Sequence, residues 1–304
     1  MGGGQDRGLR RPRDRHPDAA DRAAAGGFVG AAPARDPARV AQRAGQGQAL
    51  GDADSLTFFH MATARSNGRL PKFQRVMMVS AHPDDPDFGA GGAIARLADS
   101  GADVTYVIVT DGRQGGEDPT QKDSELIAIR EKEQRAAARV LGVKRVEFLG
   151  YKDGHLAPDL KLRRDIVRMI RKYKPELVIT HIPGRVLDAP MGGSHPDHLA
   201  VGEATMAAVY PDSRNPRAFR SLLKEGFEPH EVKEVWIPFW TQGDYLVDIT
   251  PTLDRKIEAL RKHKSQLAKP GREWDVEKFM RKRHRDVGKK GGYQYAESFK
   301  RITV

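Results

Sequence analysis

The stretch VMMVSAHPDDPDFGAGG, residues 76–92, places polar side chains directly after a short apolar run. The run VMMV is continuous rather than alternating, which is typical of a strand buried on both faces of a parallel sheet. His82, Asp84 and Asp85 follow at once, although burying such side chains without partners is costly. Because ligands bind beyond the carboxyl ends of strands in open α/β sheets, this stretch predicts a strand that carries polar groups into a cleft.

The rest of the chain alternates strand-like and helix-like segments. Further strands are expected at 103–112, 145–150, 176–181, 234–240 and 245–250. Helices are expected at 89–101, 123–142, 159–174, 196–209 and 251–267, followed by a charged, partly helical C-terminal segment. Strands that alternate with helices predict an α/β fold with a Rossmann-like, largely parallel sheet and helices on both faces.

Three more of the expected strands end in polar residues. TDG at 110–112, GYKDG at 150–154 and the region after TH at 180–181 each follow an apolar run. Parallel strands end at the same edge of a sheet, so we expect these groups to line one crevice together with the HPDD segment.

Composition narrows the kinds of protein and of metal site. The chain of 304 residues contains no cysteine, so metal ligands must come from His, Asp or Glu. No apolar run approaches the ~20 residues of a membrane span, and no secretory signal is visible. A cytoplasmic protein is the expectation.

The N-terminal segment differs from the rest in composition. Residues 1–72 are rich in Gly, Ala, Arg, Pro and Asp and poor in large aliphatic side chains. Such a segment buries too little apolar surface to offset its ordering entropy, so a disordered tail is predicted, with the folded domain at 73–304. Met61 is a candidate for the true start, which an intact mass of the native protein would decide.

The net charge of +11 raises the question of nucleic-acid binding. The basic surplus lies in residues 1–74 and 251–304, whereas residues 75–250 carry a slight acidic excess. The most basic run, RKRHRDVGKK at 281–290, contains no aromatic side chain for stacking on bases. A solvated basic surface is therefore expected, and no nucleic-acid partner.

The HPDD segment has the residue types of a metal site. His82 and Asp85 are three positions apart around Pro83, and imidazole with carboxylate suits Zn²⁺ or Fe²⁺. Asp84 lies between them, where a carboxylate can accept a proton from water activated by such a cation. The alternative is a simple turn in which an aspartate caps the following helix.

A second HPD element lies in GGSHPDHLAVGEA, residues 192–204. Pro196 fits the first position of a helix, and the spacing of His195 and His198 lets both imidazoles approach one centre. The alternative is a pair of exposed histidines at a helix N-terminus. A third HPD at 16–18 has no strand before it and receives no role.

These motifs together resemble the LmbE-like or PIG-L-type N-deacetylases over about residues 75–300. The resemblance rests on AHPDDPDFGAGG (81–92), TDG (110–112), IREKEQRAAARVLGV (129–143), FLGYKDG (148–154), GGSHPDHLAVGEA (192–204), VDIT (247–250) and HKSQ (263–266). It implies a hydrolase that uses a divalent metal, usually zinc, to remove an acetyl group from an N-acetylated amino sugar or GlcNAc conjugate. An amidase acting on a thiol–sugar conjugate and a non-catalytic metal- or polyanion-binding module are the alternatives. Family members are often oligomeric, which leaves a homo-oligomer open.

The resemblance also implies roles for particular residues. Carried onto this chain, the metal ligands would be His82, Asp85 and His198, the general base Asp84, and the group that protonates the amine or stabilises the oxyanion His195. Arg130 and Asp153 match positions that contact sugar hydroxyls, against the alternatives of a surface ion pair with Glu131 or Glu133 and of a turn aspartate. Asp111 would orient a histidine or serve a turn. Gly193 stands where some relatives carry a tyrosine.

Overall fold

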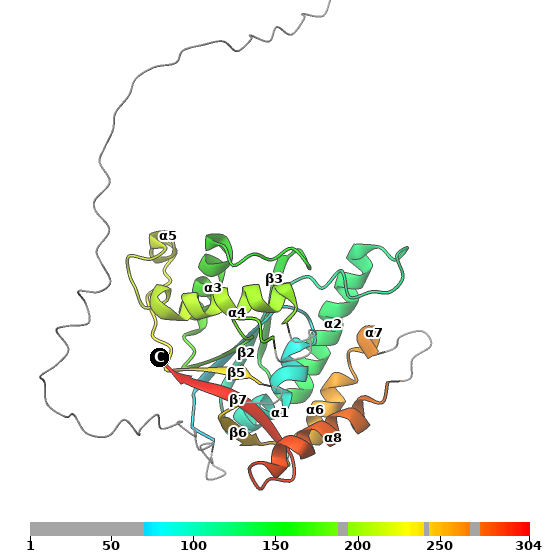
Figure 1. Cartoon of the computed structure of the whole chain (residues 1–304). Helices are drawn as coiled ribbons and strands as arrows, with labels where there is room; N and C mark the ends of the chain where they lie inside the picture. The colour runs from blue at the N-terminus through cyan, green and yellow to red at the C-terminus, as the bar shows by residue number, and fades with distance from the viewer. Residues whose placement is uncertain (1–69, 188–193, 240–242, 268–273) are drawn as a thin grey trace, which may run out of the picture. The chain divides into compact units, whose positions relative to one another are not determined.

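The computed structural model describes residues 70–187, 194–239, 243–267 and 274–304 (Figure 1). Residues 1–69 of the tail predicted at 1–72, including the candidate start at Met61, lie outside the described residues. The predicted domain boundary at residue 73 therefore stays a prediction.

A seven-stranded sheet forms the centre of the described residues. Its strands are β1 (Arg75–Ser80), β2 (Asp103–Thr110), β3 (Arg145–Tyr151), β4 (Leu177–Thr180), β5 (Glu234–Pro238), β6 (Tyr245–Asp248) and β7 (Ala296–Thr303). Their order across the sheet is β3-β2-β1-β4-β5-β7-β6. The first five strands in this order are parallel to one another, whereas β7 runs antiparallel to both β5 and β6. The predicted α/β fold with a largely parallel sheet is confirmed.

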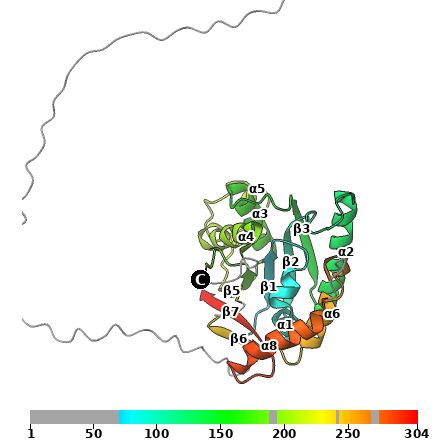
Figure 2. The ribbon, with the colours of Figure 1, turned by 45° about the vertical axis from the view of Figure 1, so that its right-hand side comes forward.

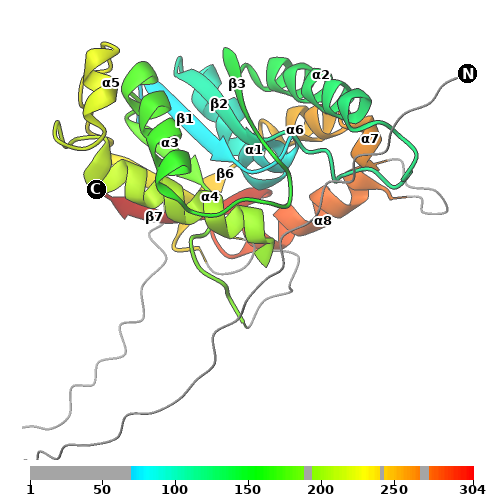
Figure 3. The ribbon, with the colours of Figure 1, turned by 90° about the horizontal axis from the view of Figure 1, so that it is seen from above.

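Helices cover both faces of this sheet (Figures 2 and 3). One face carries α1 (Asp85–Asp99), α2 (Asp123–Leu141), α6 (Leu253–Leu260) and α8 (Val276–Lys289). The other carries α3 (Leu160–Tyr173), α4 (Pro196–Ala207), its continuation η3 (Ala208–Asp212) and α5 (Arg220–Lys224). Within the described residues, no helix combines the length and the apolar character that crossing a membrane requires.

The apolar run of the opening stretch is explained by these two layers. Val76 and Met78 of β1 face the layer of α1 and α2, and Met77 and Val79 face the layer of α3 and α4. All four side chains are almost completely buried. Since successive strand residues point to opposite faces, a strand covered on both sides must be apolar throughout.

Two elements differ from the sequence-based expectation in the C-terminal part. Residues 296–303 form β7 rather than part of a helical or irregular segment. The charged residues of AESFKRIT interrupt the apolar pattern by which a strand is recognised in a sequence. One of them, Glu297, is buried as the partner of Lys256. The helix expected at 251–267 is divided into α6 and α7 (Lys264–Leu267), and the turn between them buries His263.

Helix α1 is tied to the C-terminal part by a buried ion pair. Lys256 Nζ donates to Glu297 Oε1 at 2.6 Å and to the backbone carbonyl of Phe88 at 2.8 Å. The Glu297 carboxylate accepts the backbone N–H groups of Gly92 and Ala93 at 2.9 and 2.8 Å. Side chains from α6 and β7 thus bind backbone groups in the middle of the helix that follows the HPDD segment.

Candidate metal centre and active site

The polar ends of β1 and β4 meet where the order of the sheet changes direction. From β1 the chain proceeds to β2 and β3 on one side, and β4 and β5 lie on the other. His82 follows β1 and His181 follows β4, and the backbone N–H of Ala81 donates to His181 Nε2 at 3.0 Å. Such switch points at the carboxyl ends of strands are the usual ligand sites of open α/β sheets.

The structure brings the three expected ligands together. His82 Nδ1 lies 3.2 Å from His198 Nε2 and 3.3 Å from Asp85 Oδ2, and His198 Nε2 lies 3.2 Å from Asp85 Oδ1. Four ligands at ~2.0–2.1 Å around a tetrahedral zinc ion are roughly 3.3 Å apart. The spacing of this donor set is of the size that one divalent cation requires, although His82 and His198 contact different oxygens of Asp85. Three overlapping groups are close enough to hold a metal ion, namely His82–His195–His198, Asp85–His181–His198 and His82–Asp153–Asp197, so the expected ligand set stays a prediction.

The charges at this donor set favour a cation. Burial would raise the pKa of Asp85, but the imidazoles of His198, His181 and His82 hold it well below its usual range. Burial would lower the pKa of His82, but Asp85 and two further carboxylates raise it to about 12. These shifts favour the anionic form of Asp85, which is the form that binds a cation.

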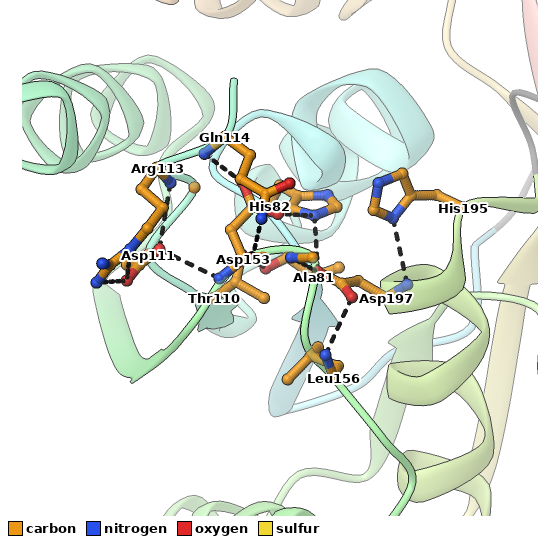
Figure 4. Close-up of polar contacts among 12 residues, drawn as sticks. Ala81, His82, Thr110, Asp111, Arg113, Gln114, Asp153, Leu156, His195 and Asp197 are labelled. Atoms are coloured by element: carbon orange, nitrogen blue, oxygen red, sulfur yellow. Dashed lines mark hydrogen bonds and ion pairs between the residues drawn. The ribbon is translucent and has the colours of Figure 1, made fainter. Parts of the chain in front are cut away.

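The far side of the His82 ring contacts two carboxylates (Figure 4). His82 Nε2 lies 3.0 Å from Asp153 Oδ1 and 3.3 Å from Asp197 Oδ2. Asp197 itself accepts the backbone N–H groups of Gly154 and Leu156 at 2.7 and 3.2 Å. Carboxylates at Nε2 fix the ring orientation and leave Nδ1 to face His198 and Asp85.

Asp84 occupies the N-cap position of α1 without capping it. Its side chain makes no capping hydrogen bond, which rules out the simple turn-and-cap alternative for this residue. Its φ of 112° is rarely adopted by residues other than glycine. Burial raises the pKa of Asp84 to about 6, although the guanidinium of Arg130 opposes this shift from 3.4 Å. Asp84 is thus a carboxylate next to the candidate ligand Asp85 that makes no capping contact with α1.

Arg130 and Asp153 are both buried and both already engaged. Arg130 donates to the carbonyls of Pro83 and Gly112 at 2.6 and 2.7 Å, and it forms no surface ion pair with Glu131 or Glu133 in this structure. Asp153 contacts His82 and accepts the backbone N–H of Gln114 at 2.9 Å. Their observed contacts support the HPDD turn and His82, and contact with a sugar stays a prediction.

His195 stands beside the donor set at the start of α4 (Figure 4). Its ring meets that of His82 edge-on, with 4.8 Å between centroids. Its Nδ1 accepts the backbone N–H of Asp197 at 3.2 Å. Burial and the imidazoles of His82 and His198 lower the pKa of His195. In the neutral ring the proton is consequently on Nε2.

Asp111 contacts Asp153, which in turn contacts His82, rather than His82 itself (Figure 4). Its carboxylate accepts two hydrogen bonds from the guanidinium of Arg113, at 2.8 and 2.6 Å, and the backbone N–H of Asp153 at 3.3 Å. The backbone N–H of Arg113 also donates to Asp111 Oδ1 at 3.2 Å, so of the two expected roles these contacts agree with the turn and not with orienting a histidine. Gly193 lies outside the described residues.

Two residues of the centre were not among the expected site residues. His181 stacks on His198 with 4.2 Å between centroids, and its Nε2 lies 3.3 Å from Asp85 Oδ2. Asp197 contacts His82 from the middle of the HPDH motif. The Asp197 position could have been found from the repeated HPD pattern, whereas a single histidine after a strand has no spacing to identify it.

Comparisons with known proteins place this chain in a family. The family model described as PIG-L, GlcNAc-PI de-N-acetylase, matches residues 77–209, from β1 to η3. Diacetylchitobiose deacetylase of Thermococcus kodakarensis is 35% identical over 75% of this chain and 82% of its own length. The chain belongs to the PIG-L family. The resemblance inferred from the motifs is therefore confirmed.

Two further PIG-L relatives extend the comparison. A probable N-acetyl-α-D-glucosaminyl L-malate deacetylase 2 of Bacillus anthracis is 32% identical, covering 64% of this chain and 82% of the relative. The solved N,N'-diacetylchitobiose deacetylase from Pyrococcus horikoshii superposes with a TM-score of 0.69 at 33% identity, covering 76% and 84% of the two chains. The PIG-L fold thus extends well beyond the segment matched by the family model.

Proposed function

We propose that this protein is a metal-dependent hydrolase that removes the acetyl group from an N-acetylated amino sugar, in the form of a GlcNAc conjugate. The observation that carries the proposal is the convergence of His82, Asp85 and His198 at mutual distances of 3.2–3.3 Å, beside a carboxylate that caps nothing. Relatives named as deacetylases of diacetylchitobiose and of N-acetylglucosaminyl malate support the choice of reaction and substrate class.

Zn²⁺ is the proposed cofactor. Two imidazole nitrogens and one carboxylate with an open position are typical of catalytic zinc, and the same donor types also suit Fe²⁺. When bound, the cation would acidify a water molecule and polarise the acetamide carbonyl. The protein would contribute the ligands and hold their orientation through Asp153 and Asp197 on the outer side of His82.

Asp84 would transfer the proton of this hydrolysis. It accepts a proton from the attacking water as the water oxygen bonds to the carbonyl carbon. The carbon–nitrogen bond then breaks, and a proton passes to the leaving nitrogen, so that the products are acetate and a free amine. Burial raises the pKa of the Asp84 carboxyl, which is the direction that suits a group that first accepts a proton and then returns it.

His195 would stabilise the oxyanion as a neutral imidazole. Its Nδ1 accepts the N–H of Asp197, so a proton added at Nδ1 would set two N–H groups against each other. The Nε2–H group remains as a hydrogen-bond donor, and donors aimed at developing negative charge lower the barrier substantially. Of the two roles implied for His195, oxyanion stabilisation therefore agrees better with its contacts than proton donation.

The test is a deacetylation screen with defined metal content. The protein is stripped with a chelator, reloaded with Zn²⁺ or Fe²⁺, and given GlcNAc, N,N'-diacetylchitobiose and N-acetylglucosaminyl malate while free amine and acetate are measured. We expect amine and acetate in equal amounts, only with metal present. Turnover restricted to a longer acyl chain on a thiol–sugar carrier would indicate the amidase instead, and no turnover of any acyl amino sugar by the metal-loaded protein would refute the proposal.

A further inference from the structure

A chain of buried polar contacts connects the HKSQ segment to the backbone of Asp84. His263 Nε2 lies 2.7 Å from Asp87 Oδ2, and the same carboxylate oxygen accepts Gln134 Nε2 at 2.8 Å. Gln134 Oε1 in turn accepts the backbone N–H of Asp84 at 2.7 Å. His263, Asp87 and Gln134 are each at most 1% exposed. The contacts thus join the α6–α7 turn, α1 and α2 to one peptide group.

The orientation of the Gln134 amide follows from its two neighbours. A carboxylate on one side requires the NH₂ group of the amide, and a backbone N–H on the other side requires its oxygen. Asp87 is itself held, because Tyr106 donates to its other oxygen at 3.2 Å. Only a side chain with a donor and an acceptor at its end satisfies both neighbours of Gln134.

The peptide that Gln134 holds is an unusual one. Asp84 has φ 112° and ψ −33°, outside the regions that non-glycine residues normally occupy. Such conformations persist only where the surroundings determine them, and they cluster at functional sites. This conformation leaves the side chain of Asp84 uninvolved in capping α1, although aspartate at an N-cap normally bonds to the helix backbone.

We propose that Gln134 is a positioning residue that, fixed by Asp87 and His263, holds the backbone of Asp84 so that its carboxylate faces the metal centre. This inference rests on the proposed role of Asp84 as the general base. It also gives a task to the HKSQ segment, whose histidine supports the base from a distance. Gln134 touches neither substrate nor metal ligands in this role and acts only through Asp84.

The first test is Gln134→Met, which keeps the size of the side chain and removes both hydrogen bonds. We expect unchanged metal content and KM, with kcat lower by about 10- to 100-fold, since small misplacements of a catalytic group have effects of this size. The matched control is Thr252→Val, which removes a different buried hydrogen bond to α1, from Thr252 Oγ1 to the Gly92 carbonyl at 2.8 Å. Thr252→Val should lower Tm and leave kcat unchanged.

A double-mutant cycle separates this proposal from the proposed function. If Gln134 acts through Asp84, Gln134→Met should have no further effect on kcat in an Asp84→Asn background. Full activity of Asp84→Asn would refute the base itself. Normal kcat in Gln134→Met, together with an inactive Asp84→Asn, would refute only the positioning role, as would full additivity in the double variant.

A rescue covers the case in which Gln134→Met does not fold. Gln134→Glu keeps an acceptor for the N–H of Asp84 but sets a second carboxylate against Asp87, so kcat should fall. Adding Asp87→Asn restores a donor on that side and should recover much of the lost kcat at unchanged metal content. A double variant no more active than Gln134→Glu, although folded and metal-loaded, would overturn the proposal.

Discussion

Two adjacent aspartates differ in backbone conformation and in contacts, which supports the different tasks proposed for them. Asp85 begins α1, accepts the backbone N–H of His82 at 2.7 Å and points its carboxylate at the imidazoles of the donor set. Asp84 has a positive φ, makes no cap and remains near Arg130. One residue is thereby suited to bind a cation and its neighbour to transfer a proton.

Substitution of Asp84 should separate metal binding from turnover. Asp84→Asn keeps the shape of the side chain and removes the base, so kcat should fall by about 10²- to 10⁴-fold. Metal content measured by mass spectrometry should stay the same, because the three donor atoms are untouched. In the comparison variant His198→Ala the metal should be lost, and an unchanged metal content there would contradict the ligand set.

The carboxylates behind His82 should affect metal affinity. Removing the charge in Asp197→Asn weakens the group that orients His82 from the side opposite the donor set. Partners of metal-bound histidines typically contribute 10- to 100-fold in affinity, so the metal dissociation constant should rise by about that factor. Competition with a chelator of known affinity measures it, and an unchanged constant would show that Asp197 has only a structural role.

At the residue scale, sequence spacing identified the candidate site residues that lie close together in the sequence or belong to a repeated motif. His82, Asp84 and Asp85 follow one strand, and the HPD pattern repeats at His195, so these positions could be predicted. Gln134 could not, because a glutamine inside a helix carries no spacing signal and its partners come from three separate elements. The positive φ of Asp84 was equally invisible, since the surroundings impose it.

At the scale of elements, α1 links the site to the rest of the fold. Its N-terminus carries Asp84 and Asp85, and its middle packs so closely that a Cβ on Gly92 would lie 2.8 Å from Ile249 side-chain atoms. The start of this helix was expected at residue 89 and is found at Asp85, because Pro86 fits the first turn. Boundaries of this kind depend on capping contacts that sequence patterns do not fix.

Two glycines of α1 should respond in opposite ways to alanine. Gly92→Ala forces a methyl group against Ile249 and should destabilise the protein by about 1–3 kcal/mol. At Gly89 the added Cβ would lie 3.5 Å from Pro238, an ordinary contact, so Gly89→Ala should stabilise by up to about 1 kcal/mol. Urea unfolding of both variants tests this, and equal effects would show that the close approach at Gly92 is not limiting.

At the scale of the whole described fold, the C-terminal part completes the layer that carries the site. The family model ends at residue 209, yet Lys256, His263 and Glu297 all lie beyond it and all contact α1 or its partners. The parallel half of the sheet could be predicted because strands such as β1 and β4 are continuous apolar runs. Strand β7 could not be predicted, because its sequence contains a glutamate that can be buried only when it is paired with Lys256. That pairing is not visible in the sequence.

The buried pair of Lys256 and Glu297 should be strongly coupled. Lys256→Met leaves the Glu297 carboxylate buried without its cation, which should cost about 3–5 kcal/mol of unfolding free energy. The double variant Lys256→Met with Glu297→Gln should recover a large part of that loss. Chemical denaturation measures both, and a single variant as stable as the original protein would show that the carboxylate is paired elsewhere.

The position of β7 has a consequence for biosynthesis. The ribosome releases β5 and β6 long before residues 296–303, but β7 must enter between them. Until then the nascent chain presents an open strand edge of β5, and exposed edges recruit other strands. A message cut short just before these codons would yield a product with its β5 edge permanently uncovered, prone to aggregate and to be cleared by proteases.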